Sequence, residues 1–283
     1  MIAATDSNCI GSPTSTSPRQ MRRSLLVTLA AWIASLAATT THCLAHPATP
    51  THMASTKALF FSSGIQQRLE VAIRSNDAAA VGQLLSEGAR VDARGVHEAT
   101  PLMIAVDAQA EQAVAALLRA GANPNLKAAD GAGAVHLAVR NRATAPRGRA
   151  ILEMIMRAGG DPNTIRPDGD PVIVQFTFDH DLDGIRWFKS LGANLDIRGR
   201  SGRPIISDLA FGQNWDSVWA LIELGARYDY EGSLDALSGA LDSPYASSPD
   251  AQLYPCKRKV WQLFKDHGMA VKPWREARRP VSP

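Results

Sequence analysis

The segment 179-DHDLDG-184 carries three aspartates at alternating positions, followed by a glycine. The same spacing opens an EF-hand loop, in which oxygen ligands at alternate positions bind calcium. The twelfth position of such a loop holds a glutamate that binds the ion through both oxygens, but here it is Ser190. We therefore interpret the segment as the start of a helix, where the helix dipole favours an acidic residue, and we predict no calcium site.

His136 and Cys256 are the other residues whose chemistry suggests a site. His136 could act as a base or bind zinc, but no two histidines after position 45 have the i, i+4 spacing of a helical zinc site. Cys256 precedes 257-KRK-259, whose charges favour the reactive thiolate, but the sequence identifies no base to orient it. G-x-S-x-G, P-loop and G-x-G-x-x-G motifs are also missing from the sequence. We predict that the protein is not an enzyme and has no metal or cofactor.

The elements that position these residues follow from an internal repeat. Five segments each contain the end of an apolar run, a glycine, a small residue, and then Asp or Asn. These segments are 85-LSEGARVDAR-94, 118-LRAGANPNLK-127, 156-MRAGGDPNTI-165, 189-KSLGANLDIR-198 and 222-IELGARYDYE-231. Their glycines recur at one constant interval, except for a longer step between Gly121 and Gly159. A constant interval of this kind indicates stacked units that each pack only on their neighbours.

A second set of segments recurs upstream of these glycines, with a polar residue, an early proline and then apolar residues at helical spacing. The set comprises 100-TPLMIAV-106, 133-GAVHLAV-139, 170-DPVIVQF-176 and 203-RPIISDL-209. Such a pattern predicts the start of a helix. Each unit is therefore predicted to contain a helix, a short turn, a second helix that ends at a left-handed glycine, and a hairpin-like loop.

This arrangement resembles the ankyrin repeat, whose period of about 33 residues equals the constant interval and whose signature is T-P-L-H-x-A. Thr100-Pro101-Leu102 matches the first half of the signature, and 135-VHLA-138 matches the second. The resemblance covers about residues 65–270 and implies an all-α ankyrin-repeat solenoid of about six helix-turn-helix units with short β-hairpin loops. The first unit, from Ile65, and the last unit are atypical, as capping units are.

The resemblance also assigns structural roles. It places Leu182 in the core, Asp183 in the first turn of a second helix, and His136 among the hydrogen-bonding residues that link neighbouring turns. The third unit departs from the repeat by five extra residues within 140-RNRATAPRGR-149, between its two helices. The last unit contains a further insertion, 242-DSPYASSPDAQLYP-255, before a helix near 256–268.

A column of loop residues is the best candidate for binding. The residues six positions after each repeat glycine are Arg94, Lys127, Ile165, Arg198 and Glu231, and Arg166 and Arg200 lie close by. Stacked units would align these positions along one edge, near the hairpin tips, where an acidic ligand or protein could bind. The alternative is a solvated edge of mixed charge.

The tryptophans of the second helices supply another candidate. The register predicts that Trp187 and Trp215 are buried, whereas Trp219 occupies a position that is usually exposed. Trp219 is therefore either a surface anchor for a partner or packs against Arg186 or the next unit.

The N-terminus carries a predicted signal peptide. Met21-Arg22-Arg23 precedes the apolar run 25-LLVTLAAWIASLAA-38, and we place cleavage after Ala45. The run is too short to span a membrane comfortably. Cys43 does not follow a lipobox, so we do not expect lipid anchoring. We predict that the protein resides in the periplasm.

The predicted organisation has five parts. Residues 1–20 lie upstream of the true start at Met21 or are disordered, 21–45 form the signal peptide, 46–64 a linker, 65–275 the ankyrin-repeat domain, and 276–283 a basic disordered tail. Residues 256–283 hold eight basic and two acidic residues, whereas residues 46–255 are mildly acidic. A basic tail can contact anionic lipid or an acidic partner, or simply be a solvated terminus.

The resemblance implies a non-enzymatic protein that binds another protein, is a monomer when unbound, and does not bind nucleic acid. The chain resembles exported ankyrin proteins encoded beside type VI secretion effectors, some of which are phospholipases. Its Ala-rich early repeats, its degenerate later repeats such as 203–229, and its closing 267-HGMAVKPW-274 carry this similarity. We predict an immunity protein that inhibits a toxic effector. The alternatives are a periplasmic scaffold that supports an enzyme or oxidative-stress defence and, third, a hydrolase or metal enzyme.

Overall fold

The computed structural model describes residues 59–62, 64–229, 233–241, 254–269 and 271–273. The chain divides into two compact units, Met1–Lys57 and Ala58–Pro283, and every described residue belongs to the second. The predictions made for residues 1–20, the signal peptide, the tail and most of the linker therefore lie outside the described residues. The same is true of Glu231 and of most of the insertion at 242–255.

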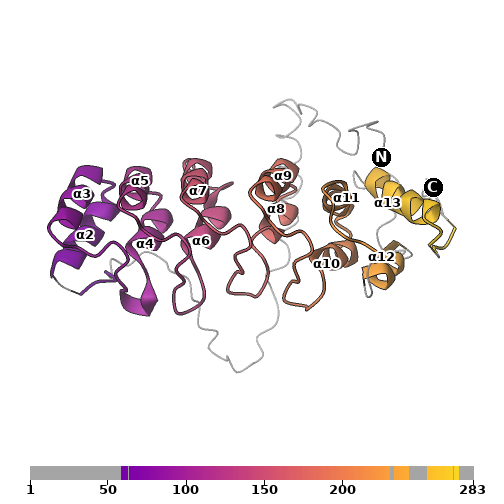
Figure 1. The fold of residues 1–283 in the computed structure, drawn as a ribbon, viewed down its shortest axis with the longest axis horizontal. Coiled ribbons are helices and arrows are strands. Elements are labelled where there is room, and N and C mark those ends of the chain that lie inside the picture. Colours follow the sequence, from indigo (N-terminus) through magenta and orange to yellow (C-terminus); the bar gives the residue numbers. More distant parts are fainter. Residues whose placement is uncertain (1–58, 63, 230–232, 242–253, 270, 274–283) are drawn as a thin grey trace, which may run out of the picture. The chain divides into compact units, whose positions relative to one another are not determined.

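The described residues form α-helices that follow one another along the chain in six pairs (Figure 1). The pairs are α2 (Gly64–Arg74) with α3 (Ala78–Ser86), α4 (Pro101–Asp107) with α5 (Glu111–Arg119), α6 (Ala134–Asn141) with α7 (Gly148–Arg157), α8 (Val174–Phe178) with α9 (Leu182–Ser190), α10 (Ile205–Phe211) with α11 (Trp215–Glu223), and α12 (Ser233–Leu241) with α13 (Tyr254–Asp266). A short 3-10 helix, η1 (Val96–Glu98), precedes α4. The prediction of an all-α solenoid of about six helix-turn-helix units is confirmed.

The helices stack in two rows, with the apolar core between them. The first helices α2, α4 and α6 contact one another in one row, and the second helices α3, α5 and α7 do so in the other (Figure 1). Fully buried side chains come from successive units and include Leu117, Ile151, Phe188 and Trp215. The core therefore continues from unit to unit, so each unit is stabilised by its neighbours. None of the described helices is both long enough and apolar enough to cross a bilayer.

Every second helix ends at a glycine in the left-handed conformation, as the repeat predicted. The φ angles of Gly88, Gly121, Gly159, Gly192, Gly225 and Gly268 lie between 71° and 102°. The residue after each glycine donates its backbone N–H to the carbonyl five positions earlier, as from Ala122 to Leu117 at 3.0 Å. This backbone hydrogen bond satisfies a carbonyl at the helix end, and after the glycine the chain enters the hairpin.

Replacing Gly121 by alanine tests this cap in isolation. A Cβ atom at Gly121 would meet no other atom within 4 Å, so the change adds no steric clash. The cost comes only from forcing an L-residue into the left-handed conformation, at φ 86°. We expect Gly121→Ala to lower the free energy of unfolding by about 1 to 2 kcal/mol, measured by urea denaturation. The control Gly82→Ala, within α3, should have no such penalty, because φ is not positive at that residue.

The first helices begin as predicted, with one exception. Thr100 caps α4 by accepting the backbone N–H of Met103 at 3.3 Å, and Pro101 opens the helix. α8 instead begins only at Val174, although the sequence predicted a helix from the segment 170–176. Residues 172–174 are Val-Ile-Val, and β-branched side chains disfavour the helix. At this point the α-helix is replaced by a tighter turn, in which a backbone N–H donates to the carbonyl three positions earlier. Val174 N–H, for example, donates to the Pro171 carbonyl at 3.1 Å.

Recurring Asp and Asn side chains join each unit to the next. Each lies four positions after a repeat glycine and accepts a backbone N–H from the following unit. The pairs are Asp92 with Asn123 at 3.1 Å, Asn125 with Asp161 at 2.8 Å, Asn163 with Asn194 at 2.7 Å, and Asp196 with Arg227 at 2.7 Å. This ladder explains the Asp or Asn in the repeat, and it fixes the spacing of the hairpins along one edge.

Candidate binding surface

The segment 179–184 forms a helix start, as the register predicted. Oδ1 of Asp181 accepts the backbone N–H of Gly184 at 2.8 Å and thereby caps α9. Leu182 is buried, which confirms its assignment to the core, and Asp183 lies in the first turn. Asp183 is exposed and pairs with Arg186 at 2.9 Å. The residues that the structure describes include no group of three acidic, His or Cys side chains that could hold a metal ion.

The basic partner of the remaining acids comes from the insertion of the third unit. Arg142 Nη2 lies 2.8 Å from Asp179 Oδ2, and Arg142 Nε lies 3.5 Å from Asp181 Oδ2. The guanidinium carbon sits 3.8 Å from the centre of the Phe176 ring, and the Arg142 side chain is only 3% exposed. Arg142 Nη1 also donates to the Val139 carbonyl at 2.8 Å. The insertion therefore joins the third unit to the fourth.

A second contact between an arginine and an aromatic ring also joins the third unit to the fourth. The Arg149 guanidinium carbon lies 4.4 Å from the centre of the Trp187 ring. Trp187 is half-buried, so the prediction that it is buried was wrong. The register assumed that all units pack equally, but α7 and α9 pack less closely on each other than α5 and α7 do. Arginine from the third unit covers Trp187 there.

The predicted column of basic residues is aligned along the hairpins, and each of its first two members donates to the backbone of the next member of the column. Arg94 Nη1 donates to the Lys127 carbonyl at 2.6 Å, and Lys127 Nζ donates to the Ile165 carbonyl at 3.0 Å. Each of these residues thus reaches its own counterpart in the next unit. Arg198 Nη1 donates to the Gly202 carbonyl of its own hairpin at 2.7 Å. Arg94 and Lys127 therefore link hairpins as well as presenting charge.

Arg166 and Arg200 differ in how far they reach into solvent. Arg166 is held in its hairpin by an ion pair with Asp168, and its side chain is 17% exposed. The Arg200 side chain is 67% exposed, with Nε at 3.5 Å from Oδ2 of the nearly buried Asp170. Of the two, Arg200 is the more accessible to a partner.

Trp219 lies on α11, which belongs to the row of second helices. Its side chain is half-buried, and Lys259 Nζ of α13 lies 5.4 Å from the ring centre. The next unit thus covers part of Trp219, as the packing alternative requires. Trp215 is 1% exposed, which confirms its predicted burial. Cys256 is fully buried, so its thiol is not open to a substrate.

His136, on α6, does not make the linking hydrogen bond that the resemblance implies. Its Nδ1 atom is buried and has no hydrogen-bond partner. The second unit has a capping threonine, Thr100, where the third unit has Gly133, so the third unit has no hydroxyl at that position. Burial, followed by the positive charges of Arg140 and Arg166, lowers the pKa of His136 from its ordinary 6.5 to about 4.

This lowered pKa predicts an acid-sensitive fold. Above pH 6.5 His136 is neutral whether the chain is folded or unfolded. Between pH 6.5 and about 4 the unfolded chain takes up a proton that the folded chain does not, so stability falls as the pH falls. We expect His136→Gln to remove roughly 1 to 2 kcal/mol of that fall, because the ring is only partly shielded from water. Urea denaturation at pH 7.5 and pH 4.5 tests this, and an equal fall in both proteins would contradict it.

Two exposed phenylalanines were missed by the sequence analysis. Phe178 and Phe211 end the first helices α8 and α10, occupy the same repeat position in consecutive units, and are 59% and 51% exposed. The corresponding residues of the two preceding units are Arg140 and Asp107, which pair at 3.3 Å. The repeat spacing was the available signal, but it does not show which repeat positions are exposed.

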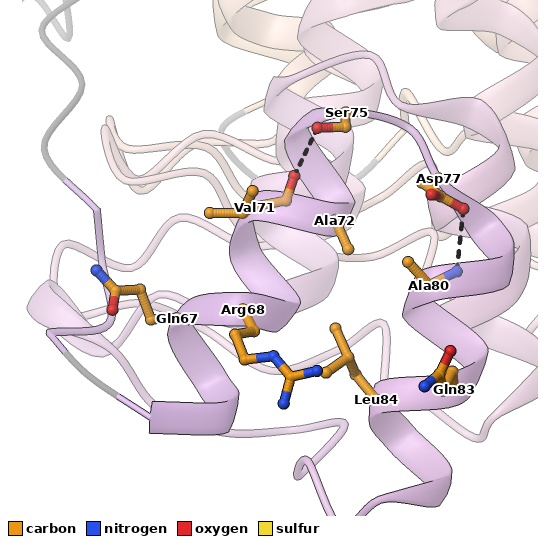
Figure 2. A pocket seen from close by; sticks show the side chains of 9 residues that line it. All are labelled: Gln67, Arg68, Val71, Ala72, Ser75, Asp77, Ala80, Gln83 and Leu84. Carbon is orange, nitrogen blue, oxygen red and sulfur yellow. Dashed lines mark hydrogen bonds between the residues drawn. The ribbon is translucent and has the colours of Figure 1, made fainter.

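A cavity lies elsewhere, in the first unit (Figure 2). It has a volume of about 470 Å³ and is lined by Gln67, Arg68, Val71, Ala72, Ser75, Asp77, Ala80, Gln83 and Leu84. All of these residues belong to α2, α3 and the turn between them. Asp77 is engaged as the cap of α3, where it accepts the N–H of Ala80 at 3.0 Å (Figure 2). Ser75 Oγ donates to the Val71 carbonyl at 2.9 Å, so the hydroxyl and the carboxylate that line this cavity are each hydrogen-bonded to backbone (Figure 2).

Residues 97–129 match the family model described as Ankyrin repeat. The match spans the second unit, and its helix-turn-helix arrangement recurs in the other described units. No curated protein matches the chain. The match and the repeated geometry together support the ankyrin-repeat family, and the fold is the all-α ankyrin solenoid that the sequence predicted. Ankyrin repeats indicate a protein–protein interaction module, typically without enzymatic activity.

Proposed function

We propose that this protein is a periplasmic immunity protein that binds and inhibits a toxic effector of type VI secretion. The predicted signal peptide supports export. The similarity to exported ankyrin proteins encoded beside such effectors supports the target class, which includes phospholipases. The ankyrin solenoid supports inhibition by binding, because stacked repeats offer an extended surface to a partner.

The observation that carries the binding role is the distribution of charge on the hairpin between α9 and α10. Residues 198–203, RGRSGR, contain three arginines and no acid. The side chains of Arg200 and Arg203 are 67% and 51% exposed, whereas their partners Asp170 and Asp208 are 11% and 32% exposed. The positive groups therefore project farther than the carboxylates beneath them. This edge suits an acidic partner.

Affinity capture tests the proposal. The tagged chain is used to capture proteins from the periplasm and from competitor secretions, and the product of an adjacent effector gene is tested directly. We expect the effector to be captured, and a strain that lacks this chain to be killed by neighbours that deliver it. A deletion strain that resists its neighbours but is sensitive to peroxide would favour the scaffold alternative and contradict the proposal.

Charge reversal tests the edge itself. We expect Arg198→Glu with Arg200→Glu to weaken binding to the captured partner at least about tenfold, because favourable charge pairs become repulsive. Arg198 is chosen because its side chain donates within its own hairpin, whereas Arg94 and Lys127 join neighbouring hairpins. Arg200 is chosen for its exposure, and because it pairs with Asp170 of the preceding hairpin, the urea midpoint of the double variant is compared with that of the parent chain. The control is Arg157→Glu on α7, whose side chain is 79% exposed. Equal affinity of the double variant and the control, measured by calorimetry, would refute the role of this hairpin in binding.

A further inference from the structure

Phe178 and Phe211, here called the aromatic pair, occupy the same repeat position in consecutive units. Each is the last residue of a first-row helix, and more than half of each side chain is exposed. A single exposed apolar side chain is ordinary on a protein surface. Two large rings at the same register position are different, because stacked units place equivalent residues side by side on one face. Aromatic residues left in solvent in this way are typical anchors of protein interfaces.

The aromatic pair is confined to the fourth and fifth units. In the second and third units the same register position holds Asp107 and Arg140, which pair with each other at 3.3 Å. This repeat position therefore holds charged residues up to the third unit and phenylalanines from the fourth unit. Arg142 joins these two units by its ion pairs with Asp179 and Asp181. A partner that uses the rings would be positioned at the ends of α8 and α10, next to Arg203, whose guanidinium group stacks on Phe211.

The charges beside the rings indicate what the partner must carry. The Arg203 guanidinium carbon lies 4.7 Å from the centre of the Phe211 ring, and its side chain is half exposed. The carboxylate closest to Phe178 in sequence, Asp179, is already engaged by Arg142 at 2.8 Å. Asp208 accepts bonds from Arg203 and from Ser201. Asp179 and Asp208 are 35% and 32% exposed, less than the 51% of Arg203, so the most accessible charge beside the Phe211 ring is a guanidinium group.

We propose that Phe178, Phe211 and Arg203 form the docking site for an acidic protein segment, in which an aromatic or leucine side chain is flanked by carboxylates. The apolar side chain packs against the two rings, and the carboxylates accept hydrogen bonds from Arg203 and from Arg200. This inference rests on the proposed protein-binding function but does not depend on the partner being a toxin.

A peptide-display selection against the purified chain tests the site without a known partner. The probe is a library of random dodecapeptides displayed on phage. We expect the selected peptides to contain an aromatic residue or leucine beside two or more acids, and to bind more weakly as salt rises. Selection of basic peptides, or failure to enrich any sequence, would overturn the proposal.

Fluorescence polarisation with the best selected peptide then tests the named residues. We expect Phe178→Ala and Phe211→Ala each to weaken binding about tenfold, a typical loss for an interface anchor. The matched control is Val71→Ala on α2. Val71 is 51% exposed and lies in the first unit, whereas the two phenylalanines lie in the fourth and fifth units. The urea midpoints of all three variants should stay close to that of the parent, because the replaced side chains are largely exposed. Unchanged affinity in the double variant Phe178→Ala with Phe211→Ala would overturn the proposal.

The two proposals fail separately. If a captured effector binds the double variant as tightly as the parent chain, the aromatic site is wrong and the immunity function stands. If no effector is captured while acidic peptides bind the rings as expected, the target class is wrong and the site stands.

Discussion

Arg142→Ala should lower the free energy of unfolding by about 2 to 3 kcal/mol, a large share of the stability of an ordinary domain. Removing the guanidinium leaves Asp179 and Asp181 without their cation and opens a space over the Phe176 ring. Breaking a buried ion pair can cost more, but Asp179 and Asp181 are 35% and 32% exposed and would be partly hydrated. Urea denaturation followed by circular dichroism measures the loss.

The same substitution should also change the shape of the transition. The stability of a solenoid is approximately the sum of its units and of the interfaces between them, so weakening one interface can uncouple the two sides. We expect two resolved unfolding steps in Arg142→Ala, with α2–α7 and α8–α13 on either side of the break. Arg142→Met, which keeps an apolar chain over Phe176, should lose less. A loss below about 0.5 kcal/mol with a single transition would contradict the linking role of the insertion.

Trp215→Ala should have the largest effect on stability, about 3 to 5 kcal/mol, because it leaves a cavity at a fully buried aromatic position. Trp219 provides a control of the same residue type, one helical turn along α11. Because Trp219 is half-buried under Lys259, we expect Trp219→Ala to cost only about 1 to 2 kcal/mol.

The two tryptophan variants also distinguish a packing role of Trp219 from a binding role. If Trp219 only packs against the last unit, Trp219→Ala reduces stability and leaves affinity for the captured partner unchanged. If Trp219 is the surface anchor that the sequence suggested, affinity falls by more than the loss of folded protein explains. A stability loss for Trp215→Ala no greater than that for Trp219→Ala would show that the core is not where the structure places it.

The register of the repeat predicted most of the fold because it rests on local rules. The glycines recur where a left-handed residue must end a helix, and Leu182 and Trp215 fall in the core because the period places them there. The late start of α8 was missed because a period sets where a helix is expected, not how three β-branched residues in succession, 172–174, alter its first turn.

The binding surface was predicted less completely, because it depends on spacing between units. The alignment of Arg94, Lys127 and Arg198 along the hairpins follows from the period. That Arg94 and Lys127 reach the carbonyls of the next hairpin depends on the stacking distance, which composition and spacing do not determine. The pairing of Arg142 with two acids of the next unit depends on the path of the inserted loop.

We propose that this ankyrin solenoid binds an acidic protein, a toxic effector, through the hairpin of residues 198–203 and the aromatic pair. Calorimetry of the purified chain with the product of the neighbouring effector gene tests it most directly. We expect a one-to-one complex of at least micromolar affinity that blocks the effector's activity and weakens about tenfold or more in Phe178→Ala with Phe211→Ala. No heat of binding, with the effector fully active in an excess of the chain, would contradict this proposal.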